Sequence, residues 1–184
     1  MSTLPNQRMT VDEFLVWAEA QPGRYELYNG IAYAMAPERA QHAKVKHRAA
    51  KSLEQGIEKA GCGCFMLPDG MTVRVDKDTA HEPGALVYCG PELPPDAVEV
   101  SNPVILVEVL SPSTRKLDAS AKLMGYFSLP SVQHYLIIDP DKLPIVHHQR
   151  QADGTILTRM IHQGAIRLDP PGIEVAVEDI RPGS

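Results

Sequence analysis

Residues 104–110 read Val-Ile-Leu-Val-Glu-Val-Leu, a run of branched apolar side chains with one carboxylate inside it. Runs of this kind are typical of strands that are covered on both faces of a sheet, so the segment predicts a central strand of an α/β fold. An isolated carboxylate in such a strand costs free energy unless it is neutralised. Glu108 therefore needs a partner, and an ion pair, an edge-strand position or a divalent metal ion would each serve.

A lysine follows this strand within reach of it. Apolar residues at helical spacing predict a helix over residues 116–129. Asp118 and Lys122 are four residues apart and share a face of that helix, which is consistent with an ordinary surface ion pair. The same face can also return toward the end of the strand. Two carboxylates from neighbouring strands, a divalent ion and a lysine would then form a centre for phosphodiester hydrolysis.

Local signals define the elements before the central strand. Thr10-Val-Asp-Glu13 matches a capping box and predicts a helix over residues 11–20. Alternating apolar residues around Asn29-Gly30, the strongest short signal for a two-residue turn, predict a β-hairpin over residues 24–35. Residues 37–59 carry an apolar stripe and predict a long helix.

The sequence predicts further strands before and after the central one. Alternation and short apolar runs predict strands at residues 71–75, 85–89 and 136–138, and a second hairpin from residues 144–150 and 155–162. Helices and strands come in mixed order, and no repeat or long linker divides the chain. We expect one domain over residues 1–184, of class α/β (α+β), with an N-terminal helix and hairpin added to its core.

Composition places the chain among ordinary globular proteins. It has 184 residues, 43% hydrophobic and 22% charged, and its 18 Lys and Arg against 23 Asp and Glu give a net charge of −5. This excludes wholesale disorder and a surface that coats polyanions as a whole. No apolar run approaches the roughly 20 residues of a membrane span, and the first residues lack a signal-peptide pattern. We expect a cytoplasmic protein without membrane contact.

Cysteines and paired histidines favour structural interpretations. The odd number of cysteines (Cys62, Cys64 and Cys89) and the spacing of the first two suit neither a disulfide framework nor a zinc ribbon, so we expect buried free thiols. His147-His148 lies in a predicted strand, where neighbours point to opposite faces. We expect an exposed pair rather than a metal site.

An ordered set of short motifs runs through residues 10–140. The motifs are Arg24-Tyr-Glu-Leu-Tyr-Asn-Gly30, His42, Glu82-Pro83, Glu108-Val-Leu-Ser-Pro-Ser-Thr114, Asp118, Lys122, Tyr126 and His134-Tyr-Leu-Ile-Ile-Asp-Pro140. Together they resemble the Uma-type restriction endonuclease family of the PD-(D/E)xK nuclease superfamily. The resemblance implies a restriction-endonuclease-like core, with a mixed central β-sheet flanked by helices, and a DNA endonuclease that uses Mg²⁺ or Mn²⁺.

The resemblance also implies roles for individual residues. Glu108 and the backbone carbonyl of Val109 would hold the metal ion. The usual lysine position of the (D/E)xK element is Leu110 here. Because the family supplies a lysine from the following helix, Lys122 would stabilise the attacking water or the charge that develops on the phosphate.

Two more residues complete the candidate catalytic set. Glu26 in the predicted hairpin and His42 in the long helix occupy positions that the family places near the site. Taken alone, His42 also fits a solvated histidine on a helix surface.

The sequence departs from the family at one metal-binding position. The family pattern Pro-Asp is Pro83-Gly84 here, and glycine offers no ligand atom. Metal affinity should fall, and Glu108 should become harder to keep charged. Glu82 would share a face with position 84 in a strand, displaced by about 6.6 Å, and is a candidate substitute ligand.

A basic stretch favours a nucleic-acid partner. Residues 39–51 contain five Lys or Arg and no Asp or Glu, which could follow a phosphate backbone or form a solvated helix face. The candidate nucleic-acid-binding residues are Arg39, Lys44, Lys46, Arg48, Lys51 and Arg115.

These observations support three functions. The first is a metal-dependent DNA endonuclease, weakened by Gly84. The second is a non-catalytic nucleic-acid-binding or assembly protein on a nuclease scaffold, and the third is a structural or protein-interaction domain. Because superfamily nucleases often cut two strands with two active sites, the resemblance also implies a two-fold homodimer.

Overall fold

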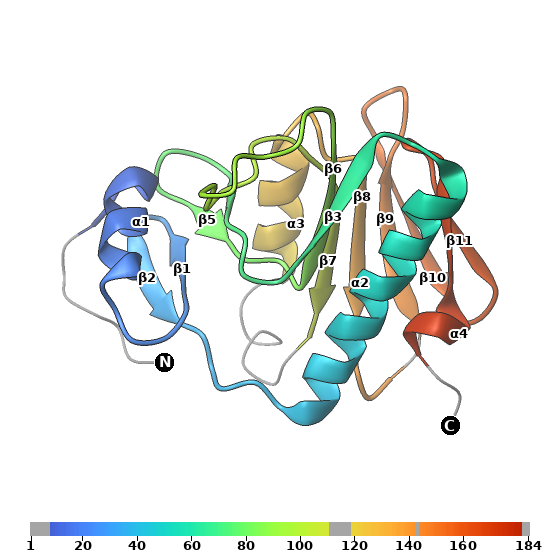
Figure 1. The fold of residues 1–184 in the computed structure, drawn as a ribbon, viewed down its shortest axis with the longest axis horizontal. Coiled ribbons are helices and arrows are strands. Elements are labelled where there is room, and N and C mark those ends of the chain that lie inside the picture. The colour runs from blue at the N-terminus through green and yellow to red at the C-terminus, as the bar shows by residue number, and fades with distance from the viewer. Residues whose placement is uncertain (1–7, 111–118, 143, 182–184) are drawn as a thin grey trace.

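The computed structural model describes residues 8–110, 119–142 and 144–181, and these form a mixed α/β architecture (Figure 1). Its helices are α1 (Val11–Glu19), α2 (Ala40–Ala60), α3 (Ala119–Ser128) and the short α4 (Val177–Ile180). Its strands are β1 (Tyr25–Tyr28), β2 (Ile31–Ala34), β3 (Cys64–Pro68), β4 (Val73–Arg74), β5 (Ala80–His81), β6 (Ala85–Cys89), β7 (Pro103–Val109), β8 (His134–Ile138), β9 (Ile145–Arg150), β10 (Ile156–Ile161), β11 (Ala165–Leu168) and β12 (Ile173–Ala176).

A six-stranded mixed sheet forms the centre, in the order β10-β9-β8-β7-β6-β3. Strands β7 and β8 are parallel, and α3 lies between them in the chain, as a parallel crossover requires. The other neighbouring strands of this sheet are antiparallel. Strand β7, which carries Glu108, is therefore an inner strand with partners on both sides.

Helices α2 and α3 cover opposite faces of the central sheet (Figure 1). On β7, Val107 and Val109 belong to the core cluster that includes α2, whereas Leu106 belongs to the cluster that includes Tyr126 of α3. Side chains alternate between the faces of a strand, so Glu108 points to the same side as Leu106. This alternation directs the carboxylate toward α3.

A smaller unit combines the N-terminal helix and hairpin with β4 and β5. Helix α1 starts with the capping box of Thr10 and Glu13, and it packs on a four-stranded sheet in the order β2-β1-β5-β4. The hairpin turn at Asn29-Gly30 has φ of 50° and 78°, the two positive values that a type I′ turn needs. Because β1 pairs with β5, the hairpin lies beside the chain segment that leads into β6.

The cysteine expectation is wrong for two of the three residues. Cys64 and Cys89 form a disulfide, and Cys62 is a free, partly exposed thiol. The antiparallel register of β3 and β6 places Cys64 directly opposite Cys89. The sequence did not predict β3, so this pairing was not visible in it.

The described helices also bear on the membrane question. Even the longest of them, α2 with 21 residues, is too polar to cross a membrane, and no other helix in the described ranges is long and apolar enough.

Candidate functional site

Three buried charged side chains meet at the end of the central sheet. Lys122 of α3 donates to Glu108 of β7 and to Glu26 of β1, with both Nζ–oxygen distances 2.8 Å. All three residues are less than 10% exposed. The structure thus brings together three of the four candidate catalytic residues from three separate elements.

Burial and ion pairing act in opposite directions on these charges. Burial raises the pKa of Glu108 above its ordinary value, although Lys122 acts the other way. Burial acts on Glu26 too, but the charge of Lys122 and the hydrogen bond from it lower the pKa of this carboxyl. Burial would lower the pKa of Lys122, whereas the two carboxylates raise it. Of the two carboxylates, Glu108 is therefore the one that takes up a proton more easily.

Several polar atoms around the cluster have no hydrogen-bond partner in the described part of the chain. They include the second oxygen of Glu108, Nδ1 of His81 and the hydroxyl of Tyr126. His81 Nδ1 lies 3.9 Å from a carboxylate oxygen of Glu26, and burial lowers the pKa of His81 to about 4. The ring is consequently neutral near pH 7. Among the described residues, none donates a hydrogen bond to the second Glu108 oxygen.

A second ion-pair network lies beside the first. Lys46, on the inner side of α2, pairs with Asp69 and with Glu38, the latter at 2.5 Å. Arg24 joins Asp69 and Glu82, each at 2.6 Å. Sequence reasoning missed Asp69 and Glu38 because neither lies in a recognised motif.

The space at Gly84 is taken by the side chain of Lys46. A Cβ added at Gly84 would lie 3.0 Å from Lys46 Cδ, 3.2 Å from Lys46 Cγ and 3.3 Å from the carbonyl oxygen of Val107. Gly84 has no left-handed φ, so its backbone does not itself require glycine. Because glycine has no side chain, the Lys46 side chain has room at this position.

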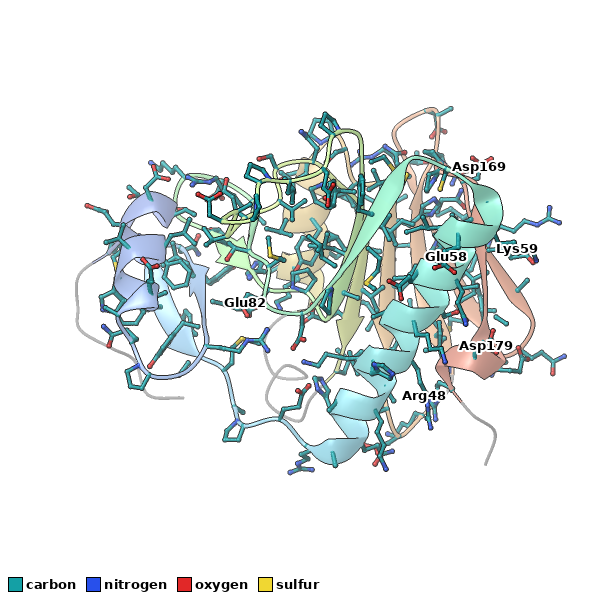
Figure 2. All side chains as sticks on the ribbon, in the orientation of Figure 1. Arg48, Glu58, Lys59, Glu82, Asp169 and Asp179 are labelled. Carbon is teal, nitrogen blue, oxygen red and sulfur yellow. A yellow bond between two sulfur atoms is a disulfide. The ribbon has the colours of Figure 1, made fainter. Side chains whose placement is uncertain are left out.

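Glu82 does not share a strand face with position 84. Residues 82–84 lie between β5 and β6 and belong to no strand, so the expected alternation does not apply. The Glu82 carboxylate is bound by Arg24, and its backbone N–H donates to Glu26 at 3.0 Å. Figure 2 shows this side chain on the loop that leads into β6.

His42 contacts the carbonyl that was expected to hold a metal ion. Its Nε2 lies 2.6 Å from the oxygen of Val109, and its Nδ1 lies 2.7 Å from Glu38. A carbonyl and a carboxylate both accept hydrogen bonds, so each ring nitrogen of His42 has an acceptor within hydrogen-bond distance. His42 is thus tied into the site rather than solvated.

The basic residues of α2 separate into two groups. Lys46 is buried, whereas Arg39, Lys44 and Lys51 are exposed and Arg48 is half-buried. Lys44, Arg48 and Lys51 follow a spacing of four and three residues and form no ion pair among the described residues. Figure 2 shows Arg48 on α2. Arg115 and Asp118 lie outside the described residues.

The expectation that His147 and His148 are exposed is wrong, because both are buried. His147 Nε2 lies 2.9 Å from Nδ1 of His134, and His134 Nε2 lies 3.0 Å from the carbonyl of Pro170. On the other face of the strand, His148 bonds Thr158 and stacks on Tyr135. The pair does point to opposite faces, but both faces are covered.

The donor set does not fit a metal centre of two carboxylates. Glu108 offers one free oxygen, but Gly84 offers no atom, and Glu82 is held by Arg24. Across residues 8–110, 119–142 and 144–181, no group of three or more His, Cys, Asp or Glu side chains could hold a metal ion. No reaction step is therefore assigned to a metal ion.

The structure is a mixed α/β fold in which an acidic residue on an inner strand is met by a lysine from the next helix, the arrangement that the family resemblance implied. The chain belongs to the Uma2 family, described as "Putative restriction endonuclease", whose profile matches residues 11–178. The fold and family that the sequence motifs implied are both confirmed.

Solved and curated proteins are also similar to this chain. A crystal structure of "a putative nuclease belonging to DUF820" from Anabaena variabilis has a TM-score of 0.72, with 14% identity, over 94% of this chain and 97% of that one. Protein slr1290 of Synechocystis is 26% identical over 97% of this chain and 94% of its own length. Protein sll1609 of the same organism is 34% identical over 36% of this chain and 38% of its own length.

Proposed function

We propose that this chain is a nucleic-acid-binding member of its nuclease family that does not need a metal ion to bind. The observation that carries this proposal is the division of cations along α2. One lysine turns inward into the site, whereas Lys44, Arg48 and Lys51 form a basic stripe outside, without an ion pair in the part of the chain that the structure describes. A basic stripe on an otherwise acidic chain is the charge pattern that binds phosphates.

The test is binding of a DNA duplex, followed by fluorescence anisotropy in EDTA over a range of salt concentrations. The double variant Lys44→Glu/Lys51→Glu should bind DNA at least ~10-fold more weakly. The slope of the logarithm of its binding constant against the logarithm of the salt concentration should be smaller by the amount that about two phosphate contacts contribute. Lys59→Glu is the matched control, because Lys59 is exposed on the same helix but lies in its last turn. Binding that disappears in EDTA, or that the double variant leaves unchanged, would contradict the proposal.

A metal-dependent DNA endonuclease is the second candidate function. It is favoured by the Glu26–Lys122–Glu108 cluster and by the free oxygen of Glu108. Lys122 would there stabilise negative charge at the reacting phosphate. Nicking of supercoiled plasmid in Mg²⁺ or Mn²⁺ that is lost in Glu108→Gln and in Lys122→Met would establish this function over the first.

The two-fold homodimer implied by the family stays a proposal. Sedimentation at micromolar concentration should show a dimer, and a monomer alone would remove it.

A further inference from the structure

We propose that Lys46 is the built-in cation of this centre: it fills the space of the missing acidic ligand at Gly84, neutralises the carboxylates beside it, and closes the centre to a divalent metal ion. The proposal concerns the metal-binding position and does not depend on whether the basic stripe of α2 binds DNA. It rests on the space at Gly84, on the charges around Lys46 and on the strand register.

The first argument is space. A Cβ at position 84 would lie 3.2 Å from Cγ and 3.0 Å from Cδ of Lys46 and 3.3 Å from the carbonyl oxygen of Val107, contacts so tight that the lysine stem would have to shift by a few tenths of an ångström. The stem of Lys46 is one-tenth exposed and lies in the helix face that packs on the sheet. Glycine at position 84 and lysine at position 46 are therefore complementary, and either residue constrains the other.

The second argument is charge. Buried ammonium groups are costly unless they are paired, and Lys46 pairs with Asp69 and Glu38. Glu38 in turn contacts His42, which holds the carbonyl of Val109. Lys46 is thus connected to the atom that was expected to bind metal.

The third argument is register. Pro68 of β3 pairs with Ala85 of β6, and the next residues outward are Asp69 and Gly84. Asp69 therefore lies beside the position that lacks its aspartate, and the lysine ammonium binds it there. A divalent ion entering this place would meet a positive charge instead of a free carboxylate.

The lysine also determines what restoring the aspartate does. Gly84→Asp places a new side chain against the Lys46 stem, and the displaced ammonium can then pair with the new carboxylate. Removing the lysine alone leaves position 84 without a ligand atom. A metal site should therefore require both changes together.

The experiment is titration of Mn²⁺ into four proteins by calorimetry and by electron paramagnetic resonance of free Mn²⁺. The four are the unsubstituted chain, Gly84→Asp, Lys46→Ser and the double variant Gly84→Asp/Lys46→Ser. We expect saturable one-to-one binding in the double variant, with an affinity roughly 10-fold or more above that of Gly84→Asp, the range seen when a neighbour of a metal ion is changed. At the same concentration, Mn²⁺ should also raise the melting temperature of the double variant more than that of Gly84→Asp.

Glu108→Gln added to the double variant should abolish binding, which locates the ion at this centre. Lys44→Ser in place of Lys46→Ser is the matched control, since Lys44 is exposed on the same helix. Circular dichroism establishes that each variant is folded. Saturable Mn²⁺ binding by the unsubstituted chain that Glu108→Gln removes would overturn the proposal, and so would equal affinities of Gly84→Asp and the double variant. Absence of binding in a folded double variant would overturn it as well.

Discussion

Lys122 donates to Glu108 at 2.8 Å, although β7 ends at Val109 and α3 begins only at Ala119. The helix that follows the central strand returns along the sheet and places its lysine over the carboxylate. A buried ion pair of this kind contributes little net stability, because removing both charges from water is costly. Removing one partner is strongly destabilising, because the other charge then stays buried without a partner.

Lys122→Met should therefore lower the free energy of unfolding by about 3–5 kcal/mol, since Glu26 and Glu108 both lose their cation. Urea unfolding followed by circular dichroism measures this loss. Arg167→Met is the control, because Arg167 pairs with Glu174 at 3.4 Å while 87% exposed, and its loss should stay below about 1 kcal/mol. Equal losses in the two variants would show that the buried cluster is not an ion-paired unit.

Tyr126→Phe should have the opposite effect. The Tyr126 hydroxyl is buried and has no hydrogen-bond partner among the described residues, so removing it should raise the free energy of unfolding by about 1 kcal/mol. Tyr88→Phe is the matched comparison, because the Tyr88 hydroxyl accepts from the backbone N–H of Leu93 at 3.2 Å, and its removal should be destabilising. A destabilised Tyr126→Phe would mean that the hydroxyl is satisfied in solution.

Elements with strong local signals were predicted correctly from the sequence. The capping box of α1, the Asn-Gly turn between β1 and β2 and the apolar run of β7 act within a few residues, and the structure confirms all three. The short strands β3, β5, β11 and β12 were missed. Their two to five residues are held by pairing with distant strands, which no local pattern shows.

The candidate site shows the same difference between residues that local sequence motifs indicate and residues whose position depends on the fold. Glu26, His42, Glu108 and Lys122 were selected from ordered motifs, and the structure brings them to one end of the sheet, whereas their catalytic roles stay a prediction. Lys46 was assigned to phosphate binding from its charge alone. A signal for its inward position was present, because Lys46 shares a helix face with Ala50 and Leu53, both buried.

Burial of the contacting pair His134 and His147 should make the stability of the protein depend on pH. Burial lowers the pKa of His134 to about 4 and that of His147 to about 3, both below the ordinary value near 6.5 of an unfolded chain. Between these values the unfolded chain binds more protons than the folded one. Stability should therefore be complete above about pH 6.5 and fall as the pH drops toward 4, by up to about 1.4 kcal/mol per pH unit for each histidine.

Urea unfolding at several pH values measures this slope. His147→Gln should make this slope smaller. The variant lacks one histidine that, at mildly acidic pH, is neutral in the folded chain and charged in the unfolded chain. His162→Gln, at an exposed position, should leave the slope as it is. Slopes that coincide in all three proteins would contradict burial of the pair.

The disulfide between Cys64 and Cys89 should stabilise the edge of the central sheet. It joins β3 to β6 across 25 residues of sequence, and reduction should lower the free energy of unfolding by about 2–4 kcal/mol. Cys64→Ser/Cys89→Ser should match the reduced protein, and Cys62→Ser should match the oxidised one. Denatured, unreduced protein treated with iodoacetamide should take up a single label, at Cys62. Three labels would show that the thiols are free and that the strand pairing of β3 and β6 holds without a covalent bond.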